Sequence, residues 1–391
     1  MQVWVRQTLS FRQAIEKKIE TEEGLVRFPV PGWMWDLELG RDMYDQRMRH
    51  IRRIDELGFD GIIFTEQHYV TVCPSPNLLV AAATQVTEQA KLVLMGNCLP
   101  LHNPVRLAEE LAMLDNLSRG RIVAGFLRGT ASSHYAFNVP GTEVRSRFAE
   151  AYDLVVRAWT DENPFEWHGD HYDYSVVSIV PRPYQQPHPP VWTVAGSAES
   201  LEWAASKRVG LIAQGTIQGA NETLDYYQNY AERECGWSPT AASRALNRDM
   251  YIAPTMAGIR DRFEDVIVPL YMQTHEYEMP NQPIPRIAEL RREEYSPRSY
   301  AYRTVQGRGA VGDRARRSPE QVAADGDWLV GDPDSITEQI LRQCQACNAD
   351  TMIVRPEMGT LALNGEVIDQ LDLFARTVLP VLHKAQSKQS A

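Results

Sequence analysis

The chain has 391 residues and the composition of a soluble globular enzyme, with 43% hydrophobic and 23% charged residues. Its formal net charge of −11 argues against a basic surface for nucleic acid and against a polybasic membrane anchor. We therefore expect no nucleic acid and no membrane among its partners. The length fits one large barrel or two domains, and length alone does not decide between them.

The N-terminal segment and the cysteines predict the compartment. Residues 1–18 contain no uninterrupted apolar core, so a signal peptide is not expected, and no apolar run approaches the ~20 residues of a membrane helix. The five cysteines are poorly spaced for disulfides, which favours a reducing compartment. Cys344 and Cys347 form a C-x-x-C inside an expected helix, and we interpret them as half-buried helix residues. These features predict a cytoplasmic protein.

Short apolar runs alternate with amphipathic or alanine-rich segments along the whole chain. The apolar runs predict strands at 3–9, 59–65, 92–95, 122–127, 191–195, 209–213, 250–254 and 351–355. The segments between them predict helices at 41–57, 77–89, 104–117, 143–159, 221–235, 335–347 and 366–383, and one that opens at 196–199. No break in composition separates two domains. The pattern predicts an α/β fold, a single TIM-like (β/α)8 barrel over residues 1–391 with insertions; a doubly wound open sheet is the competing architecture.

Two segments interrupt this alternation. Residues 163–190 are polar, aromatic and proline-rich, which predicts a surface hairpin; the spacing of 168–171 (HGDH) suits a metal, but its place in the insertion favours the hairpin, and no metal site is expected. Residues 271–327 are long, charged and glycine-containing, which predicts a mobile lid. Within them, 307–312 (GRGAVG) matches the dinucleotide fingerprint G-x-G-x-x-G. Because no buried strand precedes it and Pro319 interrupts the segment after it, we do not expect a Rossmann site.

Polar residues gather where the expected strands end, and in a barrel those ends converge. Glu66 and His68 follow the second strand, and His102 lies beyond the third. Arg128 follows the fourth strand, and Ser197 opens the helix after the fifth. A serine at a helix start and an arginine fork together predict a phosphate site. Each residue also has a simpler interpretation, as a helix cap, a surface ion pair or a structural hydrogen bond.

Six segments carry a resemblance to a known family. They are EQHY (66–69), LPLHNPVRLAEELAMLDNLSRGR (99–121), GFLRG (125–129), VAGSAESLEWAA (194–205), GDPDSITEQI (331–340) and FARTVLPVL (374–382). They resemble the bacterial luciferase-like flavin-dependent monooxygenases. The resemblance spans most of the chain and is weakest at 10–40 and 271–327.

The resemblance implies a TIM-like barrel that binds reduced FMN and activates oxygen as a peroxyflavin. It implies that Arg128 and Ser197 bind the FMN phosphate, with Gly196 and Ala198 beside them. It also implies that the end of the third strand lies under the isoalloxazine ring, and the residues there are Met95, Gly96 and Asn97.

The expected catalytic residues are His68, Glu66 and His102. An imidazole titrates near neutrality, so His68 or His102 is expected to carry a proton, and Glu66 to orient His68 or to contact the ring. The family motif has Glu-His-His after the second strand, whereas this chain has Gln67 in place of the first histidine. This departure weakens the expectation of luciferase chemistry on long-chain aldehydes.

These features together predict a two-component monooxygenase. It would take reduced FMN from a separate NAD(P)H:flavin reductase, oxygenate a small organic substrate, and form a homodimer or a higher homo-oligomer. The alternatives are a deazaflavin-dependent oxidoreductase that transfers hydride and a non-catalytic flavin-binding subunit. The sequence does not identify the substrate, and hydroxylation, Baeyer–Villiger oxidation and C–S or C–N cleavage all stay open.

Overall fold

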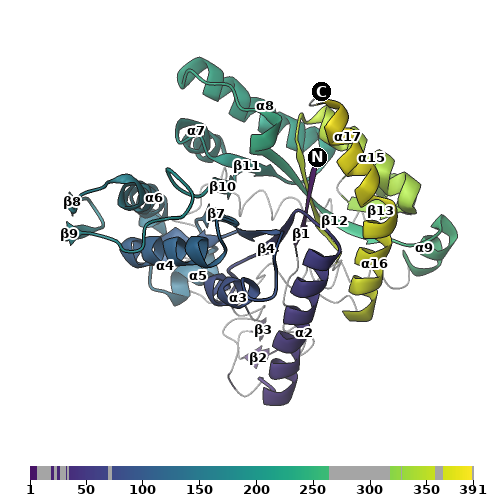
Figure 1. Ribbon diagram of the computed structural model, residues 1–391, viewed down its shortest axis with the longest axis horizontal. Coiled ribbons are helices and arrows are strands. Elements are labelled where there is room, and N and C mark those ends of the chain that lie inside the picture. The colour runs from purple at the N-terminus through teal and green to yellow at the C-terminus, as the bar shows by residue number, and fades with distance from the viewer. Residues whose placement is uncertain are drawn as a thin grey trace.

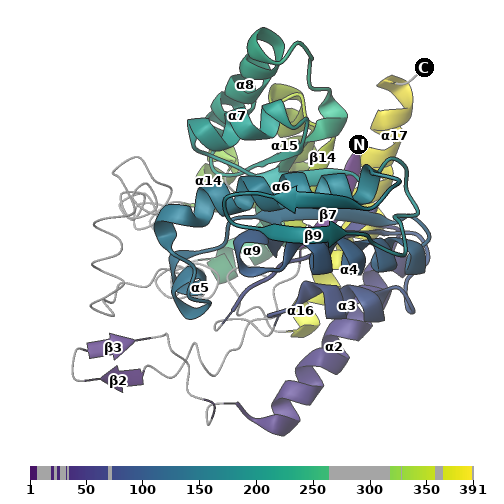
Figure 2. The same cartoon turned by 90° about the vertical axis from the view of Figure 1, so that its left-hand side faces the viewer.

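The computed structural model describes residues 1–6, 19–21, 24–26, 32, 35–68, 73–263, 318–326, 328–356 and 364–389. Within these residues, a central ring of strands is enclosed by helices, as two perpendicular views show (Figure 1, Figure 2). In Figure 1, α4 and α6 lie on one side of the strands and α15, α16 and α17 on the other.

Eight parallel strands close into a barrel. In ring order they are β1 (Gln2–Arg6), β4 (Gly61–Phe64), β5 (Lys91–Leu94), β7 (Ile122–Leu127), β10 (Val191–Val194), β11 (Gly210–Ala213), β12 (Arg244–Ile252) and β14 (Thr351–Arg355). The ring closes because β14 pairs with β1, from Gln2 opposite Thr351 to Val5 opposite Val354. The expected (β/α)8 architecture is confirmed.

The remaining elements cover the barrel or extend from it. The helices are α2 (Leu37–Glu56), α3 (Pro76–Ala83), α4 (Pro104–Leu117), α5 (Ala131–Ala136), α6 (Val144–Thr160), α7 (Ala198–Ser206), α8 (Ile217–Glu234), α9 (Met256–Arg262), α14 (Pro319–Asp325), α15 (Pro333–Ala346), α16 (Asn364–Thr377) and α17 (Leu379–Gln389). The further strands are β2 (Ile19–Thr21), β3 (Gly24–Val26), β6 (Asn97–Cys98), β8 (Phe165–His168), β9 (Asp173–Val177) and β13 (Trp328–Gly331).

Local chemistry sets the start of the helix that follows β5. Asn103 precedes α4 in an extended conformation, and its side-chain oxygen accepts a hydrogen bond from the Arg106 amide at 3.0 Å. Pro104 occupies the first helical position, where its missing N–H costs nothing. Asn103 and Pro104 therefore stop the preceding turn and fix where α4 leaves the barrel mouth.

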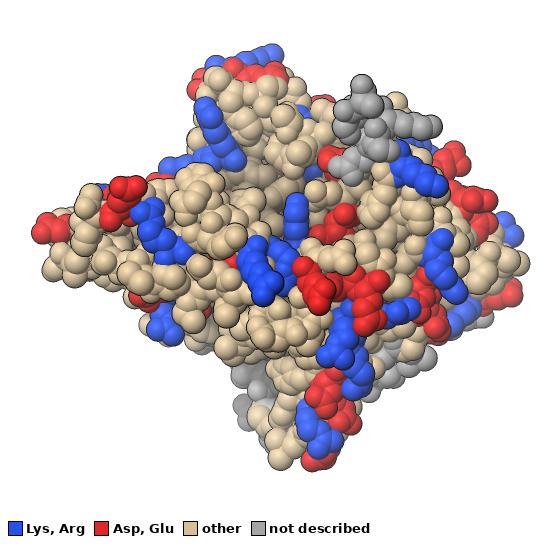
Figure 3. Space-filling model, in the orientation of Figure 1, with Lys and Arg blue, Asp and Glu red and all other residues tan. Residues whose placement is uncertain are grey.

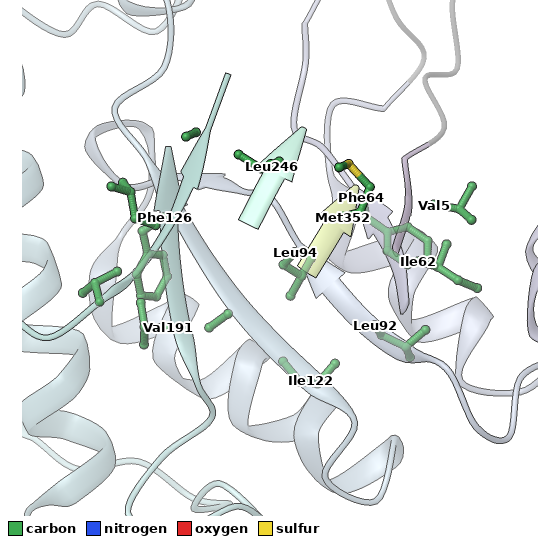
Figure 4. Packing of buried hydrophobic residues seen from close by; sticks show 14 of the residues in the cluster. Val5, Ile62, Phe64, Leu92, Leu94, Ile122, Phe126, Val191, Leu246 and Met352 are labelled. Carbon is green, nitrogen blue, oxygen red and sulfur yellow. The ribbon is translucent and has the colours of Figure 1, made fainter. Parts of the chain in front are cut away.

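Side chains at alternate positions of each strand face opposite sides, so the barrel has two apolar layers. The interior layer is Trp4, Ile63, Val93, Met95, Val123, Trp192, Ile212, Ala245 and Ile353, with Leu127 and Val194 packed against it. Trp4 and Trp192 meet edge to face, with ring centroids 5.2 Å apart. The outer layer packs under the helices, and Figure 4 shows part of it, including Phe64, Leu94 and Phe126. The interior is thus a packed core, not a channel.

The structure corrects two expected elements and adds one strand. The seventh strand begins at Arg244 and not at 250, because its first half, RALNRD, is polar on the interior face and hides the apolar pattern. Strand β13 pairs with the end of β12 and was not expected. The single helix expected at 366–383 is two helices, α16 and α17; Pro380 at the second position of α17 lacks the N–H that a continuous helix would need.

The two expected insertions differ in what the structure describes. Strands β8 and β9 pair antiparallel within residues 163–190, so this segment forms the expected hairpin. Residues 271–317 of the expected lid lie outside the described residues. The end of that segment forms α14, which begins with a capping box between Ser318 and Gln321 and buries Val322.

The approach of β5 and β7 gives a test of the packing. A Cβ added to Gly125 would overlap the Leu94 carbonyl oxygen, a backbone atom that cannot move without separating the two strands. We expect Gly125→Ala to lower the free energy of unfolding by at least about 2 kcal/mol in urea denaturation, because overpacked cores are strained. Gly196→Ala is the control, since nothing lies within 4 Å of its added Cβ. Equal effects of the two substitutions would contradict this packing.

Candidate active site

The barrel mouth lies at the carboxyl ends of the strands, where the expected site residues follow β4, β5, β7 and β10. Because these strands are neighbours in the ring, in the order β4-β5-β7-β10, their ends form one continuous arc. The structure brings the expected residues into two groups on this arc. One group is centred on Glu66, and the other on Arg128 and Ser197.

Glu66 joins both expected histidines. Oε1 of Glu66 lies 3.1 Å from Nε2 of His68, and Oε2 lies 2.8 Å from Nε2 of His102. The second oxygen also accepts a hydrogen bond from the backbone amide of Cys98 at 2.9 Å. Side-chain exposure rises from 1% at Glu66 to 10% at His68 and 29% at His102. A buried carboxylate thus bridges two imidazoles that differ in their access to solvent.

The charge of Glu66 fixes the protonation pattern of this group. Burial alone would raise the pKa of Glu66, but hydrogen bonds from His102, His68 and the Cys98 amide lower it to about 2. The carboxylate is therefore ionised near neutrality and can only accept hydrogen bonds. Both imidazoles must then carry a proton on Nε2, which leaves Nδ1 of each ring as the nitrogen directed away from Glu66.

The residues expected beneath a flavin ring divide into two kinds. Met95 is buried in the barrel interior, and Gly96 lies so close to the Gly125 carbonyl that a Cβ would overlap it. The Asn97 side chain is fully buried and donates to Asn77 Oδ1 at 2.9 Å, and Asn77 in turn donates to Glu110 on α4. The Asn97 side chain therefore anchors the end of β5 to α3 and α4.

Arg128 and Ser197 follow the paired strands β7 and β10. Glu199, in the first turn of α7, forms an ion pair with Arg145 at 3.7 Å. The pKa of Glu199 is lowered by a hydrogen bond from its own backbone amide, then by the Ser197 hydroxyl, and then by the charges of Arg145 and Arg128. Glu199 is thus an exposed anion at the amino end of a helix, with the Ser197 hydroxyl and the Arg145 guanidinium as partners. The location favours negative charge.

The backbone after Arg128 is held in place by His134 on α5. Burial lowers the pKa of His134, so the ring is neutral, and its Nε2 donates to the Arg128 carbonyl oxygen at 2.7 Å. Gly129 has φ +86, a conformation that favours glycine, and an added Cβ would lie 3.2 Å from His134 Nε2. The Arg-Gly step is therefore a fixed turn that sets the direction of the arginine.

Sequence reasoning missed four polar residues of the mouth. They are Glu199, His134, and the ion pair of Asp249 on β12 with Arg355 on β14. Arg355 was the last residue of an expected strand, but Asp249 lay one residue outside the strand expected at 250–254. Residues 244–249 (RALNRD) do not alternate between polar and apolar, so no local pattern in the sequence places Asp249 on a strand.

Other parts of the described chain carry no comparable group. His168 is 2.5 Å from Asp173 and 3.3 Å from Glu166 on the exposed hairpin. Among the described residues, no cluster of three or more His, Cys, Asp or Glu side chains could hold a metal ion. A cavity of about 470 Å³ lies at Ile217, Asp325 and Ala346, at ends of α8, α14 and α15, and contains none of the expected site residues.

The Glu66 group generates a sharp prediction. In Glu66→Gln, the amide oxygen can keep the bonds to Cys98 and His102, so the NH2 group meets His68, which must then accept. We expect His68 to move its proton from Nε2 to Nδ1, while His102 keeps the Nε2–H form. Nitrogen NMR of histidine-labelled protein at pH 8 measures both tautomers. Glu110→Gln, which replaces a carboxylate bonded to Asn77 and Arg106, is the control. An unchanged His68 would refute the assignment.

Comparison with known proteins extends these observations. The model of the family described as luciferase-like monooxygenase matches residues 32–350. An alkanal monooxygenase beta chain of Photorhabdus luminescens is 33% identical over 172 residues, which is 42% of this chain and 52% of the relative. The oxygenase component of a flavin-dependent trigonelline monooxygenase of Acinetobacter baylyi is 30% identical over 174 residues, 43% of this chain and 48% of the relative. The chain thus matches about half the length of these relatives.

Solved structures share the fold over a longer span. The oxygenating constituent of 3,6-diketocamphane monooxygenase of Pseudomonas putida, in complex with FMN, has a TM-score of 0.67 at 18% identity, covering 87% of this chain and 93% of that chain. The coenzyme F420 dependent tetrahydromethanopterin reductase of Methanopyrus kandleri has a TM-score of 0.62 at 15% identity, covering 86% of this chain and 95% of that chain. These two likenesses concern the fold alone.

The described helices include none that is both long and apolar enough to cross a membrane. The family match covers the barrel strands from β4 to β12 and both groups of the mouth. The family expected from the sequence motifs is therefore confirmed, and the chain belongs to the luciferase-like monooxygenases.

Proposed function

We propose that this chain is the oxygenase component of a two-component monooxygenase, which uses reduced FMN from a separate NAD(P)H:flavin reductase to insert one oxygen atom into a small organic substrate. The observation that carries the proposal is the anion-favouring location formed by Arg128, Ser197 and the start of α7. The Acinetobacter relative supports it, since that protein is named as an oxygenase component.

The residues present fit the phosphate of FMN. Ser197 is the N-cap of α7 and makes no side-chain cap bond, and its hydroxyl is 2.9 Å from the Ser200 hydroxyl. The phosphate would take the place of the Glu199 carboxylate and be held by Arg128, Ser197 and the backbone at Gly196 and Ala198. Met95 and Gly96 would support the ring, and Asn97 would act only through its backbone.

Reduced FMN supplies the electrons that activate oxygen, and the chain supplies position, shielding and protons. Glu66 orients His68 and His102, and Nδ1 of either imidazole can hold or deliver a proton at the mouth. Because His68 is less exposed than His102, His68 would act on the enclosed side and His102 on the solvent side.

The proposal extends to the surroundings of the enzyme. We propose a cytoplasmic homodimer or higher homo-oligomer with the reductase as its partner protein. On the face shown in Figure 3, basic and acidic side chains are interspersed, which suits an enzyme of small molecules better than one that binds nucleic acid.

The alternative is a deazaflavin-dependent oxidoreductase that transfers hydride, since the F420 dependent reductase shares the fold. Oxygen uptake with enzyme, reduced FMN and substrate distinguishes the two. Substrate-dependent oxygen uptake is expected, because the monooxygenase consumes one oxygen molecule for each product. Turnover under strict anaerobiosis would exclude the monooxygenase. A non-catalytic flavin-binding subunit would bind FMN without either reaction.

Substitution of the arginine tests the phosphate site. Arg128→Ala is expected to weaken FMN binding by about 1.5–3 kcal/mol, the contribution of a hydrogen bond to a charged group. Glu199→Gln is expected to tighten it, because a competing carboxylate is removed. Fluorescence titration of FMN measures both. Arg157→Ala is the control, since Arg157 pairs with Asp161 at the far end of α6. Equal dissociation constants for wild type and Arg128→Ala would show that the phosphate binds elsewhere.

A further inference from the structure

The interior of the barrel mouth is divided into an apolar and a polar part. At the ends of β5, β7 and β10 the interior side chains are apolar: Met95 directly after β5, Leu127 on β7 and Val194 on β10, which we call the apolar sector. The strands across the ring, β12, β14, β1 and β4, carry polar residues at the corresponding interior positions. These are Asn247, Asp249, Arg355, Arg6 and Thr65, which we call the polar sector.

The strand pairing places these residues on the interior. Side chains two positions apart on a strand face the same side. The interior residues Trp4, Ile63, Ala245 and Ile353 are each followed, two positions later, by a member of the polar sector. Asp249 is paired with Arg355 across β12 and β14, and the pairing of Val5 with Val354 brings Arg6 beside Arg355.

The centre of the polar sector is a buried ion pair. Nε and Nη2 of Arg355 donate to the two carboxylate oxygens of Asp249, and the side chains are 9% and 12% exposed. Such a pair adds little stability over an apolar pair of similar volume, because both charges lose water. What the bidentate geometry does provide is a guanidinium fixed in one plane.

Two further atoms of the polar sector call for a polar ligand. The Thr65 hydroxyl and the Asn247 side-chain oxygen are buried and have no hydrogen-bond partner among the described residues. An alkyl chain laid over them would leave both atoms unsatisfied, which is unfavourable. The Thr65 hydroxyl can donate to a carboxylate oxygen, whereas the Asn247 oxygen only accepts and would need a hydroxyl or N–H donor on the ligand.

We propose that the polar sector is the substrate subsite and that it takes a compact organic oxyanion, with a carboxylate as the simplest case, received by Arg355. The inference rests on the proposed function, because the FMN residues Arg128 and Ser197 follow β7 and β10, the strands of the apolar sector. A substrate lying between the polar sector and the apolar sector would direct its charged group to Arg355 and its apolar body to β5, β7 and β10. A long-chain aldehyde does not fit this division.

Benzoate and its neutral counterpart benzyl alcohol test the subsite on the full chain loaded with FMN. Binding is followed by the FMN absorption spectrum and by tryptophan fluorescence, to which the interior residues Trp4 and Trp192 contribute and which does not require FMN. Wild type is expected to bind benzoate at least tenfold more tightly than benzyl alcohol. Arg355→Met combined with Asp249→Asn removes both charges together. We expect this double variant to weaken the binding of benzoate at least tenfold and the binding of benzyl alcohol less than twofold.

The matched control is Arg53→Met with Asp372→Asn, an ion pair of 2.7 Å on the outside of the barrel, which should leave benzoate affinity unchanged. Thr65→Val, a conservative variant, is expected to weaken benzoate severalfold. Benzoate affinity that is unchanged by the Arg355 substitution, or a wild-type preference for benzyl alcohol, would overturn the subsite. Failure of FMN to bind would refute the proposed function instead, while the tryptophan signal still decides the subsite.

Discussion

Closure of eight short parallel strands into a ring is the constraint on which the rest of the molecule depends. Pairing of β14 with β1 leaves no edge strand in the ring, and Trp4 and Trp192 fill the interior that closure creates. All strands run in the same direction, so the residues after each strand end at the same mouth. Residues as far apart in sequence as Arg6 and Arg355 thereby become neighbours.

Three carboxylates organise this mouth by the same physical means. Glu66 holds two imidazoles, Asp249 holds the guanidinium of Arg355, and Glu199 lies at the start of α7 with the Ser197 hydroxyl and Arg145 as partners. The first two are largely shielded from solvent, and hydrogen bonds replace the water that they lose. Glu199 is exposed, and an incoming anion can replace it. The first two arrangements are therefore fixed, whereas the third is exchangeable, as a cofactor site requires.

The division of the mouth gives each part a separate task. The anion-favouring location lies beyond β7 and β10, and Glu66 with its histidines lies beyond β4, directly after Thr65 of the polar sector. Gly96 and Gly125 let the ends of β5 and β7 approach so closely that their backbones form one wall. In this arrangement, a cofactor and a substrate would meet beside Glu66 and its two histidines, which are proposed to hold the proton.

The sequence by itself determined the alternation of strands and helices and the family, because apolar periodicity and contiguous motifs are local properties. It also singled out Glu66, His68, His102, Arg128 and Ser197 as candidate site residues. It misplaced the start of β12 and missed β13, since a strand with a polar interior face lacks the apolar signal. The pairing of Asp249 with Arg355 and the sharing of Glu66 between two histidines were decided only by the tertiary structure. Such contacts depend on strand register and ring closure, which join residues that no local pattern connects.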